Sequence, residues 1–268
     1  MANLNQGLKF DSFPLWLRKG PWSPVAHAFI VVVIGSLAYV ALVTDYLEPL
    51  PGAGPPLLDP MTSALGANVR LVSCCCGLYM AGVLGAMFYT TGAWPMASYT
   101  MISWTLLMLR HVTRALAAPV SLQELLRFPA VAGATITVTV WWGVLVPAIY
   151  YFLPTPKARN WFVDLNLSPF LINVHALNLP LVMLDHALAP RPFTMTDLWV
   201  GFAVGVGYLV FYLLCLDARG VHFYIILSPR TAWCAVSYGT LLGIYCMIWQ
   251  NWGAFMDATV GFMAHGAA

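Results

Sequence analysis

The stretch SPFLINVHALNLPLVMLDHALAP, residues 168–190, is apolar enough to cross a bilayer, yet it carries polar and ionisable side chains. A bilayer core about 30 Å thick requires roughly 20 predominantly apolar residues per helix, and this run has that length. An ionisable group within such a helix costs about 2.5–3.5 kcal/mol on insertion scales, so it is a candidate for function. The stretch therefore predicts both a membrane helix and a site within that helix.

The composition of the whole chain is that of an integral membrane protein. Of the 268 residues, 60% are hydrophobic and 8% are charged, which excludes a soluble domain with a wet surface. The net charge of +2 gives no basis for a nucleic-acid partner. The six cysteines lie in apolar runs without metal-ligand spacing, so we expect free thiols, no metal and no cofactor.

Long apolar runs predict an all-α fold, a polytopic transmembrane helical bundle of about seven spans. The predicted spans are 26–47, 69–90, 94–115, 129–153, 168–188, 195–216 and 231–252. The connections are short and rich in Pro and Gly, which favours antiparallel neighbours. We expect an N-terminal extramembrane segment over 1–25, a single transmembrane domain over 26–258 and a C-terminal tail over 259–268.

The basic residues give a preferred orientation. With alternating sides, seven Lys and Arg residues fall on the side of the N-terminus and five on the other, which favours a cytoplasmic or matrix-side N-terminus. Independently of that choice, the turn that ends span 69–90 shares a membrane face with the start of span 168–188. Groups at those two positions are therefore able to meet.

One stripe of the helix over 168–188 collects its polar groups. At about 100° per residue the stripe contains His175, Asn178, Val182, Asp185 and His186, and Asn173 points nearly the opposite way. His175 lies roughly 10 Å below the membrane surface, whereas Asp185 and His186 are predicted near the far end, where water reaches them. Pro180 frees a backbone carbonyl near residue 176 and predicts a kink that widens a cavity beside His175.

Simpler interpretations exist for each of these polar groups. A lone membrane histidine is often a hydrogen-bond partner between helices, worth about 0.6 kcal/mol on average. For Asp185 and His186, a pair at the membrane interface is the favoured interpretation. Arg110, His111 and Arg114 end the span 94–115 and are most simply a basic cluster that snorkels to the surface.

The segment NVHALNLPLVMLD, residues 173–185, resembles the central motif of the androgen-induced, FAR-17a-like membrane protein family. In that motif a histidine is followed five residues later by a proline and then by an acidic residue. The flanking segments LLRFPAVAGATITVTVWWGVLVPAIYYFLP (125–154) and GVGYLVFYLLCLDARGVHFYIILSP (205–229) occur in the same order in the family. The resemblance covers about residues 70–255 and extends to the rolling-stone proteins.

The resemblance implies an intramembrane hydrolase of fatty acid esters with a threonine nucleophile and a histidine base. The histidine corresponds to His175. The threonine is expected at the start of the helix after the first family-like span, in an aromatic-x-Thr context, and FYTTGAW (88–94) supplies Thr91, with Thr90 as the alternative. Asn178 and Asp185 are the expected supporting residues. Membrane lipids are the expected partners, and the endoplasmic reticulum is the expected location.

A second interpretation is a non-enzymatic accessory subunit of a larger membrane complex, for example a mitochondrial respiratory assembly. In that case the helical fold packs against neighbouring membrane subunits, and the location is the mitochondrial inner membrane. A small-solute transporter is disfavoured because the sequence has no internal repeat and no matched pair of broken helices.

Overall fold

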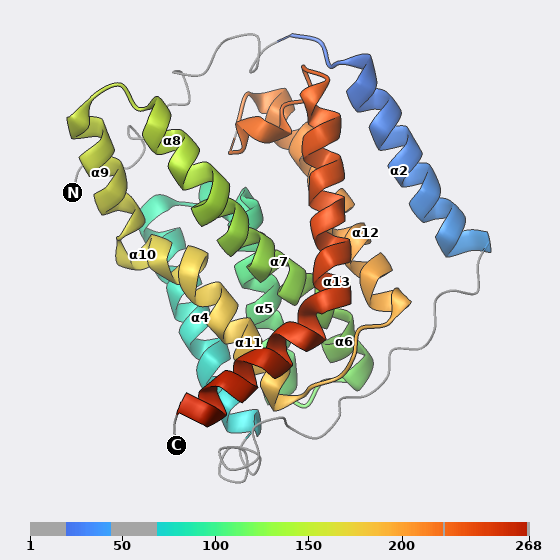
Figure 1. The fold of residues 1–268 in the computed structure, drawn as a ribbon, viewed down its shortest axis with the longest axis vertical. Coiled ribbons are helices and arrows are strands. Elements are labelled where there is room, and N and C mark those ends of the chain that lie inside the picture. Colours follow the sequence, from blue (N-terminus) through green and yellow to red (C-terminus); the bar gives the residue numbers. More distant parts are fainter. Residues whose placement is uncertain (1–19, 44–68, 222, 267–268) are drawn as a thin grey trace. The chain divides into compact units, whose positions relative to one another are not determined.

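The computed structural model of the protein describes residues 20–43, 69–221 and 223–266, which form helices and their connections, with no β-strand among them (Figure 1). These residues form two compact units. The first unit contains the described residues up to 43 together with Thr194–Met247, and the second contains 69–193 and 248–266. Most of the predicted extramembrane segment 1–25 lies outside the described residues. Lys9, Arg18 and Lys19, which enter the orientation argument, lie there too.

The second unit carries the predicted site. Its longer helices are α4 (Val69–Thr91), α5 (Tyr99–Ala115), α7 (Arg127–Val140), α9 (Pro156–Asn166) and α11 (Asn178–Leu188). Shorter helical pieces connect them: η3 (Trp94–Ala97), α6 (Val120–Leu125), η4 (Trp141–Leu145), α8 (Val146–Phe152), α10 (Pro169–Ile172) and η5 (Asn173–Leu177). The segments η4 and η5 are single turns of π-helix. This form is rare in proteins, and where it occurs it is often found at functional sites.

Helix α5 lies between α4 and α7 because small residues allow close approach on both sides. A side chain at Gly77 of α4 would stand 3.1 Å from Val112, and one at Gly133 of α7 would stand 2.7 Å from the Ser103 hydroxyl. The Trp104 indole of α5 donates to the Met80 carbonyl of α4 at 3.0 Å. Small residues at helix contacts are typical of packing within membranes.

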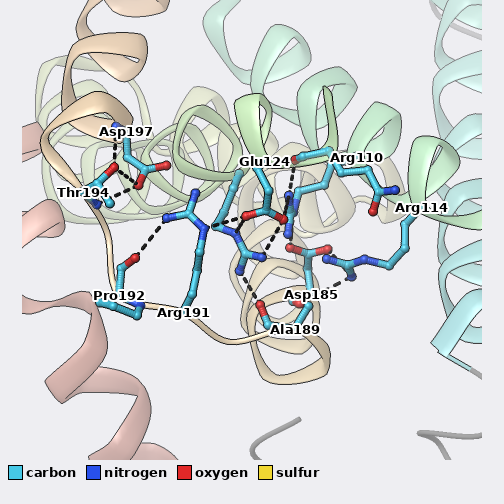
Figure 2. Close-up of polar contacts among 11 residues, drawn as sticks. Arg110, Arg114, Glu124, Asp185, Ala189, Arg191, Pro192, Thr194 and Asp197 are labelled. Atoms are coloured by element: carbon cyan, nitrogen blue, oxygen red, sulfur yellow. Dashed lines mark hydrogen bonds and ion pairs between the residues drawn. The ribbon is translucent and has the colours of Figure 1, made fainter. Parts of the chain in front are cut away.

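The first unit contains α2 (Pro24–Val43), α12 (Met195–Phe211) and the short pieces η6 (Tyr212–Leu216), η7 (Asp217–Arg219) and η8 (Ile225–Leu227). Thr194 caps α12 in a reciprocal capping box with Asp197, which the close-up in Figure 2 includes. In the connection after α12, Asp217 accepts hydrogen bonds from Arg230 and from the Trp22 indole, at 2.5 Å and 3.1 Å. The carboxylate thus links the segment before α2 to the loop after η7.

Helix α13 (Trp233–Gly266) begins in the first unit and ends in the second. It is longer than the predicted span 231–252. The backbone stays helical through Gly266, so the predicted C-terminal tail 259–268 continues this helix over its described part.

Four helical segments of the described residues are long and apolar enough to cross a membrane: Val69–Thr91, Val120–Phe152, Pro169–Leu188 and Met195–Arg219. The bundle of membrane helices is therefore supported, and the count of about seven is not. Helix α5 has 17 residues and includes Arg110 and Arg114, and α13 interrupts its apolar residues with Trp, Tyr, Gln and Asn. In helix α2, residues Pro24–Val40 form a shorter apolar stretch. Exposed side chains such as Leu78 and Phe88 of α4 fit a surface that faces lipid.

Candidate functional site

His175 lies in η5, the π-helical turn that precedes α11. Its Nδ1 is 3.2 Å from the Leu171 carbonyl oxygen, and its Nε2 is 3.3 Å from the Thr100 hydroxyl. A carbonyl only accepts, so the contact with Leu171 places the proton of a neutral ring on Nδ1. The Nε2 lone pair then faces the hydroxyl of Thr100, which is the arrangement of a general base beside a hydroxyl nucleophile.

Two neighbouring tryptophans fix the position of His175. The Trp141 ring stacks on the imidazole with the ring centroids 3.9 Å apart. The Trp142 indole donates to the His175 backbone carbonyl at 2.9 Å. Pro180, two residues into α11, has no N–H to offer the Ala176 carbonyl, one residue further along the chain. The π-helical turn η5 ends at Leu177, three residues before Pro180, in the part of the helix where the sequence predicts a kink.

Thr100 is the second residue of α5, the helix that follows α4. Ser98 caps this helix by accepting a hydrogen bond from the Met101 amide at 3.3 Å. The cap fixes where the first turn begins and so places Thr100 on the side that faces η5. Thr100 is 6% exposed and His175 is 5% exposed, so the pair is shielded from water.

The two threonines predicted from FYTTGAW make other contacts. The Thr91 hydroxyl donates to the Met87 carbonyl at 2.6 Å, and the Thr90 hydroxyl donates to the Ala86 carbonyl at 2.8 Å. Both are back-bonds within the last turn of α4, which Gly92 ends with a left-handed φ of 78°. The threonine that contacts His175 in this structure is Thr100, which sequence reasoning did not consider.

The polar stripe predicted on this helix is buried. His175, Asn178, Val182, Asp185 and His186 are each at most 5% exposed. Asn173, on the other side, bonds to the Pro169 carbonyl and to the hydroxyl of the exposed Tyr79. The Asn178 amide donates to the Val174 carbonyl at 2.9 Å, so one of its two N–H bonds is already engaged.

Asp185 forms an ion pair network inside the protein, which corrects two expectations. It pairs with Arg110 through Nε and with Arg114 at 2.7 Å, and the three side chains are at most 7% exposed. The interpretations of Asp185 and His186 as groups reached by water, and of Arg110, His111 and Arg114 as a snorkelling cluster, are therefore wrong. Arg110 and Arg114 are four residues apart on one face of α5, and that face is turned toward α11 rather than toward the membrane surface.

Glu124 of α6 holds a second group of arginines beside the first (Figure 2). Its Oε2 is 2.7 Å from Arg127 Nε and 2.6 Å from Arg191 Nε. Arg110 connects the groups, with Nη1 3.8 Å from Glu124 Oε1. We call the following six residues the arginine cluster: Arg110, Arg114, Glu124, Arg127, Asp185 and Arg191. The cluster ties together helices α5, α6, α7 and α11 and the segment after α11.

Sequence reasoning missed Glu124, Arg127 and Arg191 as members of a site. A usable indication was present, because Glu124 and Arg127 are ionisable residues three positions apart at the start of a long apolar run. Glu124 and Arg127 pair with each other, but Glu124 also pairs with Arg191, 67 positions away in the sequence. No periodicity or motif predicts such a pairing.

Within the described residues, no three His, Cys, Asp or Glu side chains are placed to hold a metal ion. All six cysteines are free thiols, and only Cys234 is buried.

No protein-family model matches the chain, and no curated protein or solved structure is significantly similar to it.

Proposed function

We propose that the protein is an intramembrane hydrolase of lipid esters that uses Thr100 as nucleophile and His175 as general base. The observation that supports this proposal is the 3.3 Å contact between the Thr100 hydroxyl and His175 Nε2, in a ring whose Nδ1 faces the Leu171 carbonyl. A base that is oriented by a second group and faces a hydroxyl is the common arrangement of covalent acyl-transfer catalysis. Apo enzymes often hold such pairs slightly apart until the substrate binds.

The position of Thr100 also suits the family resemblance better than Thr91 does. The resemblance implies a threonine at the start of the helix after the first family-like span, and α5 begins at Tyr99. The local context differs in one respect, since the aromatic residue directly precedes Thr100 instead of standing two positions before it. The lipid substrate and the endoplasmic reticulum location remain part of the proposal through that resemblance alone.

The proposed reaction has two steps. In the first, the Thr100 oxygen attacks the ester carbonyl carbon, His175 Nε2 takes the hydroxyl proton, and the proton passes to the departing alcohol. In the second, His175 takes a proton from water, the hydroxide attacks the acyl-threonine, and the fatty acid leaves as Thr100 regains its proton. Because the dyad is buried, the second step requires one water molecule to reach His175 after the alcohol has left.

The proposal is tested with purified protein in detergent or proteoliposomes and a fluorogenic long-chain ester. We expect Thr100→Ala and His175→Ala each to reduce hydrolysis by about 10³-fold or more, as for other members of catalytic dyads and triads. Thr100→Ser should retain measurable activity because it keeps a hydroxyl. Thr91→Ala is the matched control, because the Thr91 hydroxyl bonds back to the Met87 carbonyl of its own helix, and it should retain full activity.

Two results would contradict the proposal. Wild-type turnover that survives in folded Thr100→Ala would exclude Thr100, and loss of activity in Thr91→Ala alone would transfer the nucleophile to Thr91. A folded wild-type protein that neither hydrolyses lipid esters nor reacts with a fluorophosphonate probe would favour the accessory-subunit interpretation instead.

A further inference from the structure

The arginine cluster carries an excess of positive charge within the protein. The guanidiniums of Arg110, Arg114 and Arg127 face two carboxylates, those of Asp185 and Glu124, and none of these five side chains is more than 7% exposed. Backbone carbonyls near the end of α11 offset part of the charge, since Arg114 bonds to the Asp185 carbonyl and Arg127 bonds to that of Ala189. A helix C-terminus supplies only about half a negative charge. Buried charges are normally paired, so the cluster lacks negative charge.

The missing hydrogen-bond acceptor is most evident at Arg110. Its Nε donates to Asp185 and its Nη1 donates to the Gln123 carbonyl, but its buried Nη2 has no hydrogen-bond partner among the described residues. Arg110 is 0% exposed, so bulk water does not serve this donor. The Nδ1 of the buried His186, next to Asp185 in the chain, is also without a partner there. A buried guanidinium donor without an acceptor requires an explanation, and an acceptor ligand supplies one.

The depth of the cluster indicates where that ligand comes from. Glu124 is four residues from the start of the apolar segment Val120–Phe152, or roughly 6 Å along the helix. Asp185 is three residues from the end of the segment Pro169–Leu188, or roughly 5 Å. Both distances place the cluster near the ends of the apolar segments, at the depth where a bilayer has its headgroups. Basic sites between membrane helices at this depth bind anionic headgroups.

We propose that the arginine cluster binds the phosphate of an anionic phospholipid, with Arg110 as the principal donor. Arg110 would donate to a phosphate oxygen through Nη2, since its Nε and Nη1 are engaged by Asp185 and Gln123, and charge-assisted hydrogen bonds of this kind are strong. The site is separate from the Thr100–His175 pair, since Asp185 lies ten residues, or roughly 15 Å, along the helix from His175. Lipid binding at the cluster therefore does not depend on whether the protein is a hydrolase.

The first test needs no variant. The wild-type protein is purified in a mild detergent, and its bound lipids are extracted and quantified by mass spectrometry. We expect about one anionic phospholipid per protein, retained after exchange into fresh detergent. Adding phosphatidylglycerol to delipidated protein should raise the thermal unfolding midpoint, whereas phosphatidylcholine should not, because a ligand stabilises the state that binds it.

The second test compares Arg110→Lys with the matched control Arg70→Lys. A lysine at position 110 keeps a positive charge for Asp185 but loses the guanidinium fork, and Arg70 lies on the surface, where it bonds to the Ala115 carbonyl. We expect Arg110→Lys to bind phosphatidylglycerol at least about tenfold more weakly than the wild type, because it loses one charge-assisted hydrogen bond. Arg70→Lys should bind phosphatidylglycerol like the wild type.

Three outcomes would overturn the proposal. The first is purified, folded protein that holds no anionic lipid and gains no stability from phosphatidylglycerol. The second is equal lipid affinity in wild type and folded Arg110→Lys, which would place the lipid elsewhere. The third is equal stabilisation by millimolar inorganic phosphate alone, which would make a free anion the ligand. If Arg110→Lys does not fold, the extraction and the lipid titration of the wild type decide the question.

Discussion

At the scale of single residues, the role of His175 is set by the groups that face its two ring nitrogens and its backbone carbonyl. Leu171 holds the proton on Nδ1, and Thr100 faces Nε2. The Trp142 indole donates to the backbone carbonyl at 2.9 Å. Groups from three other elements, Leu171 of α10, Thr100 of α5 and Trp142 of η4, thus set the orientation of this histidine.

The Trp142 contact leads to a prediction at this scale. Trp142→Phe removes the indole N–H that donates to the His175 carbonyl and replaces the indole with a smaller ring. We expect a loss of about 0.5–1.5 kcal/mol in stability, measured as a lower thermal unfolding midpoint in detergent. The control is Trp161→Phe, whose side chain is exposed. Equal midpoints for the two variants would show that the indole hydrogen bond contributes nothing.

At the scale of the elements, α5 illustrates why composition alone gives a poor count of membrane helices. This helix has 17 residues, includes two arginines and a histidine, and has eight buried residues. Its charged face is turned toward Asp185 and its small neighbours Gly77 and Gly133 allow α4 and α7 to cover it. A helix enclosed by other helices does not need the uniform apolar surface of one that faces lipid.

The close contact between α5 and α7 leads to a second prediction. In Gly133→Ala the new methyl would stand 2.7 Å from the Ser103 hydroxyl, so the two helices must separate or Ser103 must move. We expect destabilisation of about 1–3 kcal/mol, as for overpacked cores. Gly82→Ala in α4 is the control, because nothing lies within 4 Å of the added methyl. Gly82→Ala should be neutral or slightly stabilising. Its thermal unfolding midpoint should therefore stay at or above that of the wild type, whereas the midpoint of Gly133→Ala should fall.

At the scale of the whole molecule, ion pairs join the helices of the second unit. Asp185 of α11 is paired with two arginines of α5, and Glu124 of α6 is paired with Arg127 of α7 and with Arg191 (Figure 2). Removing one partner of a buried pair leaves the other charge without compensation, which costs about 3–5 kcal/mol. The cluster therefore makes these helices depend on one another.

That dependence gives a third prediction. Asp185→Asn would leave Arg110 and Arg114 buried beside a neutral amide, and we expect the thermal unfolding midpoint to fall strongly or the protein not to accumulate in membranes. Asp164→Asn is the matched control, since Asp164 is exposed on α9. It should behave as the wild type. A midpoint for Asp185→Asn within error of the control would mean that the ion pairs do not hold the helices together.

The sequence by itself determined that the protein is a helical membrane protein and that His175 lies on a polar stripe of a membrane helix. Composition decides the class because a chain with 60% hydrophobic residues has too little polar surface for water. Helical periodicity decides which residues of one segment share a face, because it depends only on positions within that segment.

Only the tertiary structure decided which groups from distant segments meet. Thr100 contacts His175 across 75 positions of sequence, and Arg110 contacts Asp185 across the same separation. Thr91 and Thr90 satisfied the local pattern expected of a nucleophile, yet their hydroxyls return to their own helix. The difference is physical, because pairing between helices depends on how α4, α5, α7 and α11 pack, and packing depends on small residues and buried charges whose partners no local pattern specifies.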